Sequence, residues 1–89
     1  MIERTFTVRT ERGLHMRPSQ ILQAVAAQYP CAVTVRAHGT KLNGKSFMHL
    51  MTAGFGEGDT ITYVCDGPEE DACMQRLADI FDRNFEGMF

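Results

Sequence analysis

A histidine stands close to an arginine and a proline in the segment RGLHMRPSQ, residues 12–20. Proline is tolerated in the first turn of a helix but not deeper, so Pro18 predicts a helix that begins between residues 16 and 18. His15 would then lie at the N-cap of this helix or just outside it. A helix N-terminus presents unpaired N–H groups and a partial positive charge, and the Arg17 guanidinium adds a fork that suits phosphate oxygens. The spacing therefore predicts an imidazole beside an anion site.

This position predicts nucleophilic chemistry for His15. The positive helix end disfavours the imidazolium form, so the neutral ring is available as a nucleophile near pH 7. A phosphoryl group formed on the ring would lie beside the helix N–H groups and Arg17, which would stabilise its charge. No second catalytic residue accompanies the histidine, which fits a carrier that is itself modified and is not an enzyme. A lone histidine near a helix start is also commonly a surface residue or a weak cap.

The hydropathy pattern predicts elements in the order β-α-β-β-α-β-α. Alternating or β-branched segments predict four strands, at residues 2–8, 31–37, 40–43 and 59–66. Apolar stripes predict three helices, which run from residues 16–18 to Pro30, from residue 47 to before Gly54, and onward from Pro68. Four strands with one apolar face, covered by three helices, predict an α+β open-faced β-sandwich with a mainly antiparallel sheet.

Length and charge exclude several classes of protein. A chain of 89 residues predicts one domain, residues 1–89, and the formal net charge of −2 offers no basic surface for nucleic acid. The first residues, MIERTF, carry charge where a signal peptide needs an apolar run, and no window approaches 18 apolar residues. We therefore expect a cytoplasmic monomer without a membrane partner, and nothing in the pattern calls for a cofactor.

Neither cysteines nor histidines show the spacing of a metal site. Three cysteines occur without CxxC spacing, at Cys31, Cys65 and Cys73. Their odd number argues against a disulfide framework and for a reducing compartment, and their apolar faces predict buried small hydrophobes. Three histidines also lack ligand spacing, at His15, His38 and His49. No metal site is predicted.

The sequence at the start of the first predicted helix resembles the signature of a known protein family. GLHMRPS is similar to the active-site signature of HPr, the histidine-containing phosphocarrier of the phosphoenolpyruvate-dependent phosphotransferase system. NGKSFMHLMTAG, residues 43–54, resembles the family's regulatory-serine segment. The predicted element order and the chain length match the family over nearly the whole chain.

The resemblance implies a role for each matching residue. It implies that enzyme I phosphorylates His15 on Nδ1 with phosphoenolpyruvate as the source, and that the group passes to IIA proteins or domains. Arg17 would stabilise the phosphate. Ser46 matches the position that an ATP-dependent HPr kinase/phosphorylase modifies in some bacteria. An alternative is a regulatory module of the same fold, acting in a nitrogen-type system or through Ser46 without a role in sugar flux.

Four positions depart from the family pattern. Met16 replaces a small residue next to the histidine, and Ala53 replaces a branched aliphatic one. Ala24 and Ala27 stand where sugar-system members often carry lysines that meet acidic partners. These differences leave open whether the chain belongs to the sugar or the nitrogen branch.

The segment around Ser46 also satisfies a second pattern. GTKLNGKS, residues 39–46, matches the P-loop motif, which would indicate a nucleotide-binding enzyme. A P-loop belongs to a larger parallel sheet, whereas Leu42 fits the return strand of a hairpin, so we reject this interpretation. Ser46 is predicted to be the N-cap of the short helix, a role compatible with phosphorylation.

The short helix is predicted to contribute to a docking surface for partners. A two-turn helix cannot bury all its large apolar residues on one side, so one or two should be exposed near His15. Methionines in such patches adapt to several partners. The residues assigned to this surface are Met16, Gln20, Phe47, Met48, His49 and Met51.

Overall fold

The computed structural model describes residues 1–10, 16–37 and 39–85. The elements within these ranges follow the predicted order. They are β1 (Ile2–Thr7), α1 (Met16–Ala27), β2 (Ala32–Ala37), β3 (Thr40–Asn43), α2 (Phe47–Thr52), β4 (Thr60–Asp66) and α3 (Glu70–Asp82). None of the helices in this part of the chain has the length and hydropathy needed to cross a bilayer.

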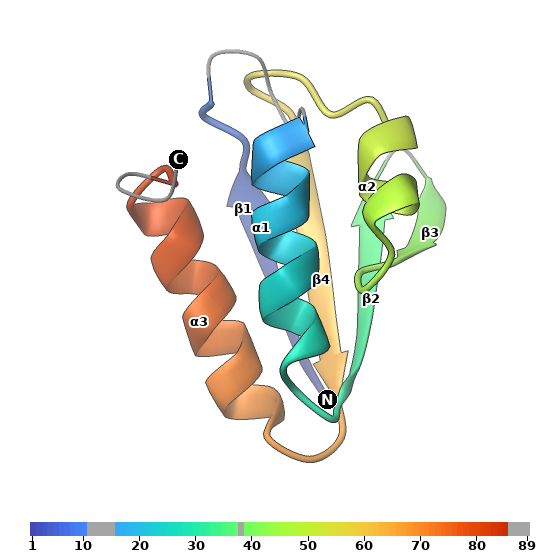
Figure 1. The fold of residues 1–89 in the computed structure, drawn as a ribbon, viewed down its shortest axis with the longest axis vertical. Coiled ribbons are helices and arrows are strands. Elements are labelled where there is room, and N and C mark those ends of the chain that lie inside the picture. The colour runs from blue at the N-terminus through green and yellow to red at the C-terminus, as the bar shows by residue number, and fades with distance from the viewer. Residues whose placement is uncertain (11–15, 38, 86–89) are drawn as a thin grey trace.

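The strands form one sheet in the order β1-β4-β2-β3, and each of its three strand pairs is antiparallel. The helices lie on one face of this sheet (Figure 1). The predicted open-faced β-sandwich is therefore confirmed. The strand order, which the sequence left open, places β4 in the middle, paired with both β1 and β2.

The first helix begins at Met16, within the predicted interval, but it ends at Ala27 and not at Pro30. Beyond it, the Gln28 N–H donates to the Val25 carbonyl (3.0 Å) and the Tyr29 N–H to the Ala26 carbonyl (3.3 Å). Each of these bonds joins residues three positions apart, whereas an α-helix joins residues four apart, so the chain tightens into a turn. The reason is local, because a proline ring disfavours helical backbone at the residue before it.

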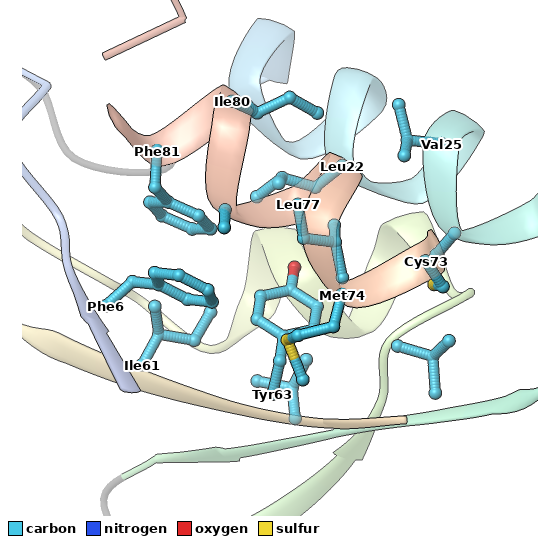
Figure 2. Close-up of a cluster of buried hydrophobic side chains, with 14 of the residues drawn as sticks. Phe6, Leu22, Val25, Ile61, Tyr63, Cys73, Met74, Leu77, Ile80 and Phe81 are labelled. Carbon is cyan, nitrogen blue, oxygen red and sulfur yellow. The ribbon is translucent and has the colours of Figure 1, made fainter. Parts of the chain in front are cut away.

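The core between sheet and helices contains an aromatic cluster (Figure 2). The rings of Phe6 in β1 and Phe81 in α3 stack with centroids 4.6 Å apart. Tyr63 of β4 meets both rings edge-on, at 6.2 and 6.1 Å, and Phe85 packs edge-on against Phe81. The Tyr63 hydroxyl is buried, accepts or donates no hydrogen bond within the described ranges, and its pKa is raised by burial.

Candidate functional site

The start of α1 is the place where the sequence predicts an anion site. Because the helix begins at Met16, the amide N–H groups of its first turn have no intrahelical acceptor and carry the positive end of the helix dipole. Among the described residues of this turn none is acidic. His15, the predicted phosphoryl acceptor, directly precedes Met16 in the sequence and lies outside the described residues.

Arg17 lies in this first turn with its side chain exposed to solvent. Its guanidinium forms no hydrogen bond or salt bridge with another described residue, so it is available to an incoming anion. The next two residues, Pro18 and Ser19, are buried. They hold the turn against the core while Arg17 and Gln20 remain at the surface. A turn that packs against the core and presents an exposed guanidinium is suited to binding a phosphate group.

Ser46 is the N-cap of α2, as predicted. Its backbone is extended (φ −104°, ψ 114°), and its Oγ accepts a hydrogen bond from the His49 N–H at 3.3 Å. The Ser46 carbonyl accepts the Leu50 N–H at 3.2 Å, which starts the helix. The Oγ atom therefore has a structural role, and a phosphate there would lie at the start of a helix.

His49 has a contact that the sequence did not predict. Its Nδ1 accepts a hydrogen bond from the Asn43 N–H at 3.0 Å, although the side chain is exposed. A ring nitrogen that accepts a bond is unprotonated, so the neutral ring carries its proton on Nε2. His49 thus joins the end of β3 to α2. No sequence signal indicated this role, because the bond depends on how the turn between the two elements closes.

The segment that matched the P-loop pattern forms the edge strand β3, as the hairpin interpretation predicted. The lysine at the conserved place of that motif, Lys45, donates from Nζ to the Tyr29 carbonyl at 2.7 Å and so joins the segment to the turn that follows α1. A Cβ atom on Gly44 would come within 2.5 Å of Val33 Cγ1. Glycine is therefore required for close packing on β2. This packing accounts for the glycine of the motif, and no nucleotide is needed to explain it.

The predicted docking residues are exposed or half-buried. Phe47 and Met51 are half-buried and Met48 is 63% exposed, whereas Leu50 of the same helix, which was not assigned to this surface, is fully buried. Met16 is 57% exposed in the first turn of α1. The two helices pack against each other, and α2 lies towards the end of the molecule where α1 begins (Figure 1). Two exposed methionines thus accompany Arg17 on adjoining helices.

The three cysteines are buried, as predicted, but their arrangement is new. The Sγ atoms of Cys31, Cys65 and Cys73 all lie within 4.8 Å of one another. Burial raises the pKa of the Cys65 and Cys73 thiols. The sequence showed that each cysteine occupies an apolar face. It did not show that these faces meet, because this depends on the pairing of β2 with β4.

An open-faced sandwich with an exposed arginine at the start of its first helix is consistent with a phosphocarrier-type protein. The profile of the family described as "PTS HPr component phosphorylation site" matches residues 2–83. The chain belongs to this HPr family of the phosphotransferase system. Members of the family are phosphocarriers and not catalysts.

Individual relatives agree with this assignment. The HPr-like protein Crh of Halalkalibacterium halodurans is 32% identical over 77 residues, which are 86% of this chain and 92% of that protein. A crystal structure of HPr-C-His from Thermoanaerobacter tengcongensis, 27% identical, has a TM-score of 0.91 and covers 96% of each chain. The domain-swapped dimer of Crh, the Bacillus subtilis catabolite repression protein, is 27% identical with a TM-score of 0.73, covering 94% of this chain and 97% of that one.

Proposed function

We propose that this chain accepts a phosphoryl group on Nδ1 of His15 from phospho-enzyme I and passes it to IIA proteins. The observation that carries the proposal is the start of α1 at Met16, immediately after His15 in the sequence. Family membership over residues 2–83, which include His15, supports it.

The chemistry is an in-line displacement at phosphorus. The lone pair of the imidazole nitrogen attacks as the donor's bond to phosphorus breaks, and the bonding electrons leave with the donor. The group that arrives is dianionic or nearly so, and the first-turn N–H groups of α1 and the exposed Arg17 guanidinium lie in the adjoining helix. The same displacement in reverse delivers the group to a IIA protein, so no second catalytic side chain is needed.

Docking relies on apolar contacts more than on charge. Arg17 is the only charged residue of α1, and Ala24 and Ala27 are exposed on that helix. Met16 and Met48 present flexible apolar side chains on the two adjoining helices. We therefore expect partners with an apolar docking groove, and association rates that depend weakly on salt.

The test is phosphorylation of the purified chain by enzyme I, phosphoenolpyruvate and Mg²⁺, followed by intact mass. One acid-labile phosphate is expected on the natural chain, none on His15→Ala, and one on the matched His38→Ala variant. Transfer onward is measured by adding a purified IIA protein. With an enzyme I that phosphorylates a known HPr, an unmodified natural chain or a modified His15→Ala variant would contradict the proposal.

A regulatory role through Ser46 is the second candidate. It is favoured by the similarity to Crh, since the Bacillus subtilis Crh is named for catabolite repression. Ser46 is only partly exposed and caps α2. HPr kinase/phosphorylase with ATP should then add one acid-stable phosphate, lost in Ser46→Ala. If only this phosphate forms and enzyme I adds none, the chain is a regulator and not a carrier.

A further inference from the structure

Three sulfur atoms from distant parts of the chain meet inside the protein. Cys31 directly precedes β2, Cys65 lies in β4, and Cys73 lies near the start of α3. The Sγ atoms of Cys65 and Cys73 are 3.7 Å apart, and all three sulfurs lie within 4.8 Å of one another. Figure 2 shows Cys73 on the core-facing side of α3 with Met74 and Leu77.

The fold holds these sulfurs in place from three sides. Val33 of β2 lies opposite Cys65 in the antiparallel register, and Cys31 is two residues earlier on the same inward face. A Cβ atom on Gly67 would lie 3.3 Å from the Cys31 Cα, so the connection from β4 to α3 passes directly against that cysteine. This close passage brings α3, and with it Cys73, onto the other two thiols.

The spacing suits one central atom bound by all three sulfurs. With atom–sulfur bonds of about 2.3 Å, three thiolates on one ion lie about 3.3–4.0 Å apart. The 3.7 Å between Cys65 and Cys73 already falls in this range. Small side-chain rotations would bring the Cys31 sulfur in from at most 4.8 Å.

Because the three thiols are buried, the charge of the bound central atom determines whether the site can accommodate it. All three cysteines are fully buried, and this burial is the main cause that raises the pKa of Cys65 and Cys73. The neighbouring groups that also act on these pKa values are the other thiols and, for Cys65, the Glu70 carboxylate. A net charge at such a place is costly. Three thiolates leave a charge of −2 around a univalent ion and −1 around a divalent ion, but none around a trivalent one. Thiolate sulfur also selects soft central atoms.

We propose that Cys31, Cys65 and Cys73 form a three-thiol binding site for a trivalent thiophilic metalloid, arsenic(III). Arsenous acid, As(OH)₃, reacts with the three thiols to give As(S-Cys)₃ and three waters. Three As–S and three O–H bonds form while three As–O and three S–H bonds break. Arsenic remains trivalent, no proton is left over, and the product is neutral as the buried site requires.

This site is separate from the proposed phosphoryl site. The 12 residues of α1 span about 18 Å along the helix axis. Cys31 follows α1 in the chain, and β2 and α3 begin near the C-terminal end of α1, opposite Met16 (Figure 1). Arsenic-loaded protein should therefore still accept a phosphoryl group from enzyme I. The two proposals can fail independently, since one is measured by arsenic uptake and the other by phosphate uptake.

The experiment treats the reduced, oxygen-free protein with sodium arsenite and records intact mass under native conditions. The expected adduct contains one arsenic atom and lacks three hydrogens, and it should raise the thermal midpoint because the ion binds the folded chain best. Single variants Cys31→Ala, Cys65→Ala and Cys73→Ala should not form this adduct. Alanine is a small apolar replacement, and circular dichroism checks that each variant folds.

Results on the natural chain decide the proposal even if a variant does not fold. An adduct that keeps one oxygen would show binding by two thiols only and would overturn it. A lowered thermal midpoint would overturn it too, because arsenite would then bind only the unfolded chain. Absence of any arsenic adduct, with or without binding of Zn²⁺ or Cu⁺ in parallel samples, would also overturn it.

Discussion

The reactive side chains near the two ends of α1 differ in exposure: those at the N-terminal end are exposed to solvent, and those near the C-terminal end are buried. At the N-terminal end, Arg17 and Met16 are exposed, and the first turn carries the positive end of the helix dipole. At the C-terminal end, Cys31 and its two neighbouring thiols are sealed in the core. Groups that must meet a partner contribute little to packing, so changes there should alter activity and not stability. Groups in the core should show the reverse.

The largest expected effect is at the exposed end. Arg17→Ala should lower phosphoryl acceptance about 10- to 100-fold, since a charged hydrogen bond contributes about 1.5–3 kcal/mol and each 1.36 kcal/mol is tenfold. Initial rates with enzyme I measure this. The urea midpoint should stay unchanged, and Arg17→Lys should retain part of the activity. If Arg17→Ala lowered the free energy of unfolding by as much as it lowered the activity, the contrast between the two ends of α1 would not hold.

The next effect is a loss of stability at alkaline pH caused by the buried thiols. Burial raises the pKa of Cys65 and Cys73, so the folded state keeps protons that the unfolded state releases. Stability is complete below about pH 8.5 and should fall above it by about 1.4 kcal/mol per pH unit for each thiol. Urea unfolding from pH 7 to 10 measures the slope.

Cys73→Ala is the matched control for this pH dependence. It should remove one thiol's share of the slope, whereas Arg17→Ala at the other end of α1 should leave the slope intact. A flat pH profile for the natural chain would mean that the thiols ionise as easily in the folded protein as in the unfolded one.

A smaller gain in stability is expected from Tyr63→Phe. The Tyr63 hydroxyl is buried and unpaired within the described residues, and such a group costs about 1–3 kcal/mol. Removing it should raise the free energy of unfolding by about 1 kcal/mol, because the ring contacts with Phe6 and Phe81 remain. Tyr29→Phe, at a half-buried position, is the control and should change little. A destabilised Tyr63→Phe would show that the hydroxyl is paired in solution.

The smallest effect is expected at the α2 cap. Ser46→Ala should cost about 0.5–1 kcal/mol, the lower part of the range for a lost N-cap, because the Oγ bond to His49 is long at 3.3 Å. Ser46→Asp should keep the stability, since aspartate is an equally good cap. Thermal unfolding compares the three chains. A Ser46→Asp variant less stable than Ser46→Ala would show that negative charge disrupts this helix.

Features set by neighbouring residues were predictable from the sequence. Pro18 restricts the helix start through its own ring, and alternating hydropathy marks the strands whatever they pair with. The cap role of Ser46 follows from the same kind of local rule. Arg17 was predicted to be a phosphate partner and lies exposed in the first turn, as that role needs. Its action on phosphate stays a prediction.

Features that depend on residues distant in the sequence were not predictable from it. The order of the strands, the bond from Asn43 to His49, and the meeting of three thiols from residues 31, 65 and 73 were decided by the tertiary structure. A local pattern shows which face of an element is apolar, but not which other face it will meet. Which faces meet is determined when the sheet and the helices bury their apolar faces against one another. In this protein that packing places three cysteines side by side, although their spacing in the sequence did not indicate a site.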